Sequence, residues 1–327
     1  MFLSLFGAFE SGIIYAIMAL GVYLSFRILD FPDLTVDGSF VTGAAIAAVL
    51  IMNGTAPIIA TCLAAIAGFI AGCCTGVLHT KGKINPLLSG ILMMIALYSI
   101  NLRILGKPTI SLLNETTIFE QLKSIWVATG IDSFFNNILA VVGIERTPGT
   151  WAVIMVMMVV TVLIKFITDY FLKTEVGLAL RATGDNKRMI RSFSANTDTL
   201  IILGIGLANA MVAFSGGLIA QLGGFADVGM GIGMIIIGLA SVIIGEALFG
   251  TKTIARATLA VIGGAIIYRI AVTLALRVDF LETGDMKMIT AFLVIVALVT
   301  PKIIQAQREK KRRLQKRAQL SVEHSRG

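Results

Sequence analysis

Four polar side chains occupy alternate positions in a part of the chain that is otherwise apolar: Asp33, Thr35, Asp37 and Ser39. Carboxylates and hydroxyls at this spacing could line a route that a polar solute follows. They could also serve as helix N-caps, a common role of Asp, Ser and Thr, whose side-chain oxygens accept hydrogen bonds from free backbone N–H groups. We take the four as candidate residues of a solute path, with capping as the alternative.

Polar residues also fall within later apolar runs. Asn209 could line the same path or hydrogen-bond between helices. Glu246 and Arg269 could be path or gate residues, or members of structural ion pairs and capping contacts. An ionisable side chain at the centre of a membrane helix costs roughly 2.5–3.5 kcal/mol, so each one needs a reason. Lys165 lies near the end of an apolar run, where we expect its ammonium group to extend to the membrane surface.

Patterns typical of catalysis are weak. The two histidines, His79 and His324, cannot assemble a Ser-His-Asp triad or a metal cluster. The stretch from Gly245 to Lys252 resembles a phosphate-binding loop, but the lysine does not directly follow the second glycine and no strand precedes it. We therefore expect that this chain is not an enzyme, holds no metal or cofactor and does not hydrolyse nucleotide by itself.

One polar segment, 173–191, stands between two long apolar runs. Its basic residues are Lys173, Arg181, Lys187, Arg188 and Arg191, and its acidic ones are Glu175 and Asp185. Most connections in compact proteins are much shorter and have no structure of their own. The segment therefore predicts a polar helix-turn-helix on which another protein acts. The alternative is a solvated loop.

The rest of the chain predicts an all-α polytopic membrane protein. Hydrophobic residues make up 57% of it and charged residues only 14%, against about 25% charged in soluble domains. Apolar runs recur, most of them about 20 residues long, enough to cross a bilayer as a helix. Pro32 and Gly38 make a continuous helix across 30–39 improbable, so this break is either a loop or a re-entrant piece. We expect about nine spans: 11–28, 40–53, 57–79, 85–105, 150–171, 199–221, 229–249, 254–276 and 286–305.

Basic residues orient these spans. Residues 302–327 hold nine Lys and Arg against two Glu, and a basic tail after a last span is expected in the cytoplasm. Counting back puts the 173–191 segment on the same side and the long loop 106–149 outside. We expect one membrane domain over 1–306, with a cytoplasmic segment at 173–197, and a basic tail over 307–327. Without aromatic residues or a fold around it, the tail does not predict nucleic-acid binding.

A weak internal repeat bears on the break at 30–39. The stretch from Phe31 to Gly38 is similar to that from Phe225 to Gly233, which adds Asp227 to the candidate path beside Asn209 and Glu246. Five spans separate the copies, so they face opposite sides of the membrane. Inverted repeats with broken helices are a recurrent transporter construction, with the substrate path where the repeats meet. Chance similarity is the alternative.

Three passages carry a family resemblance. They are Ala19–Ser25 followed by Asp33–Ser39, then Gly177–Asn186, then Gly238–Gly250. Together they resemble the permease subunits of bacterial ATP-binding-cassette (ABC) importers, in the family that serves branched-chain amino acids, ribose and nucleosides. The third passage is similar to the tryptophan/tyrosine permease branch. The inserted Asp37 departs from the sugar-permease pattern.

The resemblance implies a permease subunit in a bacterial cell membrane, paired with a second copy as a homodimer. Two ATPase subunits, which bind ATP and magnesium, would dock on the segment at 173–191, and an extracytoplasmic binding protein would deliver an aromatic amino acid or a similar small polar molecule. The residues that match the coupling segment are Gly177, Arg181, Gly184, Asp185, Asn186, Lys187 and Arg188.

Two other functions fit parts of the sequence. Inverted repeats and intramembrane carboxylates also suit a secondary transporter driven by an ion gradient. The long coupling-like segment, and the lack of central acidic residues in most spans, count against that function. A membrane enzyme or scaffold is disfavoured because no catalytic cluster is present.

Overall fold

The computed structural model describes residues 2–127, 130–133, 135–136, 147–192 and 196–276, together with six single residues between 288 and 299. The elements are α1 (Phe2–Val22), the π-helix η1 (Tyr23–Ile28), α2 (Thr35–Met52), α3 (Pro57–Thr80), α4 (Pro86–Leu105), β1 (Thr109–Ser111), α5 (Ile118–Val127), α7 (Ala152–Phe171), α8 (Glu175–Ser192), α9 (Thr197–Gly223), β2 (Phe225–Asp227), the 3-10 turn η2 (Val228–Gly231), α10 (Met234–Phe249) and α11 (Ile254–Ala275).

Eight helical segments of the described chain are long and apolar enough to cross a membrane. They agree with eight of the nine expected spans, which confirms the prediction of an all-α polytopic membrane protein. Most of the ninth expected span, 286–305, lies outside the described residues, and so does the whole tail at 307–327.

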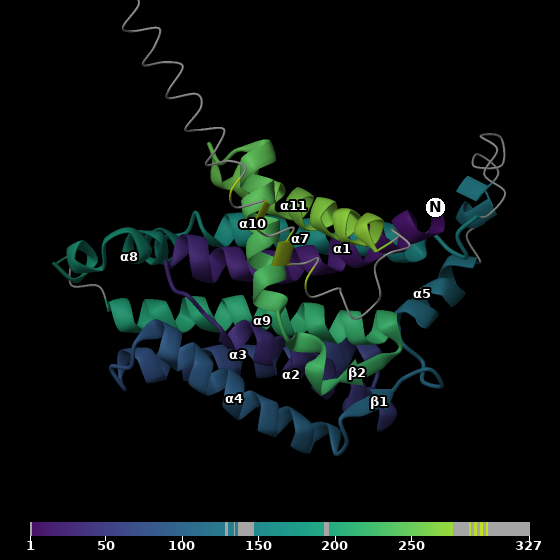
Figure 1. The fold of residues 1–327 in the computed structure, drawn as a ribbon, viewed down its shortest axis with the longest axis horizontal. Helices are drawn as coiled ribbons and strands as arrows, with labels where there is room; N and C mark the ends of the chain where they lie inside the picture. Colours follow the sequence, from purple (N-terminus) through teal and green to yellow (C-terminus); the bar gives the residue numbers. More distant parts are fainter. Residues whose placement is uncertain are drawn as a thin grey trace, which may run out of the picture.

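Helix α9 runs through the middle of the bundle. It packs against α2 and α3 on one side and against α1 on the other, while α10 and α11 pack together beside α1 (Figure 1). Glycines permit the closest approach: a Cβ on Gly43 would lie 1.9 Å from the carbonyl oxygen of Ala213, and one on Gly216 would lie 2.1 Å from that of Phe40. Small residues that let backbones touch are the usual means of packing helices in membranes.

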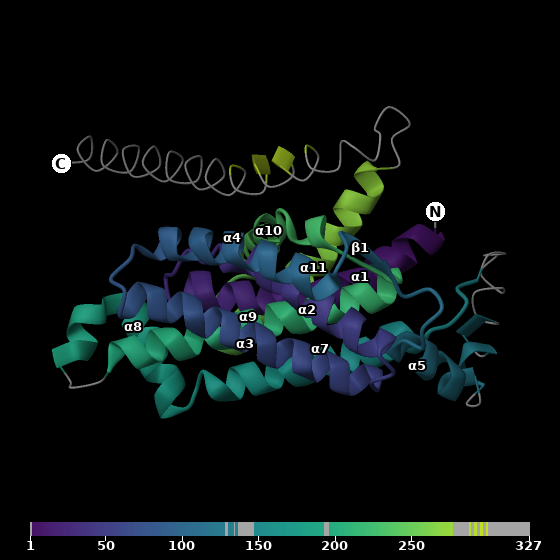
Figure 2. The same ribbon diagram turned by 90° about the horizontal axis from the view of Figure 1, so that it is seen from below.

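The two ends of the bundle differ. Helix α8 lies at one end, and α5 and the short β1–β2 ribbon lie at the other (Figures 1 and 2). The ribbon is antiparallel, with Thr109 opposite Asp227. The structure therefore separates 173–191 from 106–127, as the predicted orientation requires.

The break after the first span is shorter than expected. Helix α2 begins at Thr35, not near residue 40, because Asp33 Oδ1 accepts a hydrogen bond from the Thr35 N–H at 2.9 Å and starts the helix there. Gly38 lies inside the helix where α4 packs closely against it. A Cβ at that position would lie 2.8 Å from Leu97 Cδ1. Thr35, Asp37 and Ser39 are therefore helical residues, and only 29–34 forms the connection.

This connection folds back into the bundle. Asn209 Nδ2 donates to Asp33 Oδ2 at 2.6 Å, and Asn209 lies near the middle of α9. At 1.5 Å per residue, the start of α2 lies about 18 Å along α9 from its α8 end. The connection is thus re-entrant, one of the two alternatives that the sequence left open.

Candidate functional site

The polar segment at 173–191 forms α8, a helix kinked at Asn186 (φ −151°, ψ 86°). The Oδ1 atom of Asn186 accepts a hydrogen bond from the Met189 N–H at 3.0 Å, so this side chain caps the second half of α8. One face of α8 is buried, at Gly177, Leu180, Thr183 and Ile190. The predicted helix-turn-helix is therefore present as two helical halves around one capped kink.

The first half of α8 rests on the end of η1. A Cβ on Gly184 would lie 2.0 Å from the carbonyl oxygen of Ile28, and one on Gly177 would lie 2.1 Å from that of Phe171. Leu180 is fully buried in the same core cluster as Leu29. The two glycines predicted as coupling residues therefore face the protein's own backbone, where their lack of a side chain permits contact.

The second half of α8 is tied to the start of α9 by charge. Asp198 Oδ1 lies 3.1 Å from Arg191 Nη2 and 3.9 Å from Lys187 Nζ. Burial lowers the pKa of Lys187, and the negative charge of Asp198 opposes that shift. Lys187, another predicted coupling residue, thus has a partner within the chain.

Helix α8 has a set of exposed side chains, which we name the coupling face: Val176, Leu178, Asp185, Arg188 and Met189. The family resemblance implied a coupling role for Asp185 and Arg188, and the three apolar residues were not among the predicted ones. Exposed apolar side chains beside charges on one helix are typical of a surface that binds another protein. Their alternation with the buried Gly177 and Leu180 was the available signal.

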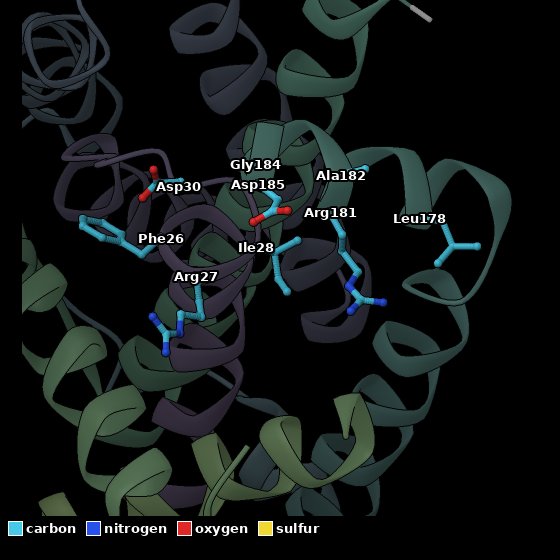
Figure 3. Close-up of a pocket in the computed structure, with 9 residues that line it drawn as sticks. All are labelled: Phe26, Arg27, Ile28, Asp30, Leu178, Arg181, Ala182, Gly184 and Asp185. Atoms are coloured by element: carbon cyan, nitrogen blue, oxygen red, sulfur yellow. The ribbon is translucent and has the colours of Figure 1, made fainter. Parts of the chain in front are cut away.

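A cavity of about 650 Å³ lies between η1 and α8. Phe26 and Arg27 reach it from η1, and Arg181 and Leu178 from α8, with Gly184 above Ile28 (Figure 3). Asp30, also at its rim, has a left-handed backbone (φ 51°), which is uncommon for a residue other than glycine. Arg181 is thus half-buried in a cavity beside the coupling face.

Glu246 lies at this same end of the bundle. Its Oε1 atom is 2.9 Å from Arg27 Nε, which ties η1 to the last turn of α10. The structure thus places Glu246 in an ion pair, the second of the interpretations that the sequence allowed. Arg269 likewise has partners: its Nε donates to Ser11 Oγ at 3.0 Å, and its guanidinium lies 5.1 Å from the centre of the Tyr15 ring.

The expectation for Lys165 was wrong. Its Nζ lies 2.6 Å from Asp169 Oδ2, one turn further along α7, and both side chains are buried. Thr258 Oγ1 of α11 donates to the other oxygen of Asp169 at 2.7 Å. Because the Asp169 carboxylate pairs with it inside the bundle, the lysine does not extend to the surface.

Three of the seven candidate path residues, Asp33, Thr35 and Asn209, form a buried polar cluster together with Thr75. Besides the Asp33–Asn209 bond, the hydroxyls of Thr35 and Thr75 lie 2.8 Å apart. All four side chains are fully buried, as is Ser39. These residues join α2, α3 and α9 in the middle of the bundle, so their visible role is to hold helices together.

Asp37 differs, because it is only half-buried. Its two carboxylate oxygens accept hydrogen bonds from the N–H groups of Gly233, at 2.9 Å, and Ile235, at 2.8 Å. A carboxylate from α2 therefore caps the N-terminus of α10, where unpaired N–H groups favour negative charge. A Cβ on Gly231 would lie 2.1 Å from the Asp37 carbonyl oxygen, so the two segments of the predicted repeat touch at this point.

The repeat segments also share a local bond. Asp227 Oδ1 accepts from the Gly229 N–H at 2.7 Å, two residues on, as Asp33 does from Thr35. Asp227 itself lies on the β1–β2 ribbon, where Thr109 donates to its other oxygen. The second segment thus enters from the ribbon end, while the first enters from the α8 end.

A second cavity opens beside Asp37. It has a volume of about 380 Å³, and we call it the Asp37 hollow. It lies between α2, α4 and η2 and is lined by Asp37, Gly38, Val41, Met94, Ile95, Tyr98, Asn101, Val228, Gly231 and Ile232. Asp37 is the one charged residue of this lining. Among the described residues, no three His, Cys, Asp or Glu side chains gather as a metal site requires.

Comparison with known proteins identifies the family. Residues 4–299 match the family described as branched-chain amino acid transport system / permease component. The chain is 43% identical over 288 residues to a tyrosine transport system permease protein of Clostridioides difficile (strain R20291), covering 88% of each chain. It is 31% identical over 299 residues to an uncharacterized protein of Rickettsia prowazekii (strain Madrid E), covering 90% of this chain and 96% of that one.

No solved structure matches the chain. The similarity to a tyrosine transport system permease agrees with the tryptophan/tyrosine branch that the third sequence passage indicated. The family match covers nearly the whole chain and includes all eight described spans except the first two residues of α1. The protein is therefore a multi-pass membrane protein that belongs to the family of branched-chain amino acid transport system permease components.

Proposed function

We propose that this chain is the permease subunit of an ABC importer, which forms the substrate path and couples it to a separate ATPase through α8. The observation that carries the proposal is the construction of α8. It does not span, it is fixed to the end of the bundle by Gly184 and Leu180, and it presents the coupling face outward. A polar face with a few apolar anchors suits a partner that must dock in one register.

The contacts around α8 suggest how motion would travel. Displacement of α8 would press on η1, because Gly184 touches Ile28. The end of η1 is tied to the last turn of α10 by the Arg27–Glu246 pair, while Asp37 holds the first turn of α10. A shift of η1 would therefore move α10 relative to α2. Packed helices change between a few discrete arrangements in this way, and π-helical turns often mark functional positions.

The substrate we propose is an aromatic amino acid. The support is the similarity to a protein named as a tyrosine transport system permease. The partners we propose are two ATPase subunits that bind ATP and magnesium, an extracytoplasmic binding protein, and a second copy of this chain. We place the protein in a bacterial cell membrane with α8 and the basic tail in the cytoplasm, in agreement with the positive-inside rule.

Reconstitution tests the proposal. The chain is placed in proteoliposomes with the ATPase and the binding protein encoded beside it, and uptake of labelled tyrosine is measured with and without ATP. We expect uptake that requires ATP hydrolysis. Arg188→Glu should weaken ATPase association and uptake, whereas Arg103→Glu, at an exposed position outside α8, should not. Uptake driven by a proton or sodium gradient without ATP would overturn the proposal and favour a secondary transporter.

A further inference from the structure

We propose that the Asp37 hollow holds the substrate during passage, with the Asp37 carboxylate receiving the α-ammonium group and the apolar wall of α4 receiving the aromatic side chain. This inference rests on the proposed function and adds to it a position in the path and a binding chemistry. Three independent features of the hollow support it.

The first feature is depth. The buried polar cluster sets the start of α2 beside Asn209, near the middle of α9, and Asp37 lies within the first turn of α2. The first turn of α10 meets it there. Two helices that begin inside the bundle, reached by connections from opposite ends, thus meet in its middle. Broken helices that meet near the bilayer midplane are where transporters place their substrate sites.

The second feature is charge. A carboxylate that faces lipid at this depth is costly, and Asp37 is only half-buried beside an open hollow. Its oxygens accept hydrogen bonds from the backbone N–H groups of Gly233, Met234 and Ile235, which leaves about one of the carboxylate's four acceptor positions free. A groove filled by acyl chains would leave this position unsatisfied. A water-filled path, or an ammonium group, would satisfy it.

The third feature is the lining. At about 380 Å³ the hollow falls within the range of roughly 300–1,000 Å³ that is usual for small-molecule sites. Met94, Ile95 and Tyr98 form the wall from α4, and Ile232 lies on the side of η2. Apolar walls with a methionine and an aromatic ring favour an aromatic group. One carboxylate beside such walls fits a molecule with a cationic head and an apolar body.

Cysteine accessibility tests the inference. The native residues Cys62, Cys73 and Cys74 are first replaced by serine, and Ile95→Cys and Tyr98→Cys are then made one at a time. Ile66→Cys on α3 and Val159→Cys on α7 are matched controls, because all four native side chains are 54% to 68% exposed and lie away from helix ends. Each variant is reconstituted with the ATPase and binding protein and treated with a charged, water-soluble thiol reagent.

We expect the two hollow cysteines to react at least tenfold faster than the two controls. We also expect tyrosine, delivered by the binding protein, to slow their reaction. Reaction at the control rate would mean that lipid or a second copy fills the hollow, and would overturn the inference. Fast reaction that tyrosine does not slow would overturn it too, because the hollow would then hold water and not substrate.

Asp37→Asn isolates the role of the charge, because it keeps the side-chain size and one acceptor oxygen for the α10 cap. In the Ile95→Cys background it should leave the reaction rate without tyrosine unchanged and abolish protection by tyrosine. If tyrosine still protects the cysteine in Asp37→Asn, the ammonium group of the substrate is bound by other groups and the role of Asp37 is refuted. ATP-dependent uptake is measured in the vesicles whose protein retains Asp37, because Asp37→Asn is itself expected to lose uptake. Its presence with an unreactive hollow refutes this inference alone, whereas its absence refutes the proposed function.

Discussion

Gly184→Ala perturbs the contact through which α8 is proposed to act. The added Cβ would lie 2.0 Å from the Ile28 carbonyl oxygen, so α8 and η1 must separate by about 1.4 Å to reach the 3.4 Å of ordinary contact. The obstacle is backbone, which cannot rotate away. Overpacking of this kind costs about 1–3 kcal/mol, and the gain of about 0.5–1 kcal/mol from replacing a helical glycine offsets only part of it.

The assay pairs thermal unfolding in detergent with ATP-driven tyrosine uptake. Gly184→Ala should lower the unfolding temperature and reduce uptake several-fold while ATP hydrolysis continues, because α8 is displaced from η1. Gly7→Ala in α1 is the matched control: nothing lies within 4 Å of its added Cβ, so stability should hold or rise and uptake should not change. Equal effects from the two variants, or no effect from Gly184→Ala, would refute the reasoning.

Two further predictions concern ion pairs. Arg27→Glu should reduce uptake but change the free energy of unfolding by less than about 1 kcal/mol, because the Arg27–Glu246 pair is partly exposed. Adding Glu246→Arg should restore uptake. A double variant as impaired as the single one would contradict the link from η1 to α10. Lys165→Met should lower stability by about 3–5 kcal/mol in thermal unfolding, because it leaves a buried carboxylate unpaired. Adding Asp169→Leu should recover most of that loss, and its failure to do so would argue against a buried charge as the cause.

The sequence predicts the helices well because their signals are local. The apolar runs predict six of the eight spans to within two residues of their observed bounds, while the first two helices begin earlier than predicted. The charged composition of α8 marks it as a helix that does not span. Its exposed apolar residues were not predicted, because Leu178 and the buried Leu180 look alike in sequence. Only contact with η1 and α9 decides which of them is covered.

The candidate path could be predicted only in part, because its partners lie far apart in the chain. Asp33 and Asn209 bond across 176 residues, and Asp37 reaches the start of α10 across 196 and 198 residues. Residue type alone could not separate Asp33, which is fully buried, from Asp37, which faces a hollow. That difference comes from the re-entrant connection, which turns one carboxylate toward α9 and the other toward α10.

We propose α8 as the surface through which an ATPase drives this permease. Its most direct test is site-specific cross-linking in a cysteine-free background, with Met189→Cys on the coupling face, Ile125→Cys on α5 at the opposite end of the bundle, and single cysteines in the docking groove of the ATPase. We expect a cross-link from residue 189 whose yield changes when ATP is added, and none from residue 125. A cross-link from residue 125, or none from residue 189 in vesicles that take up tyrosine with ATP, would contradict it.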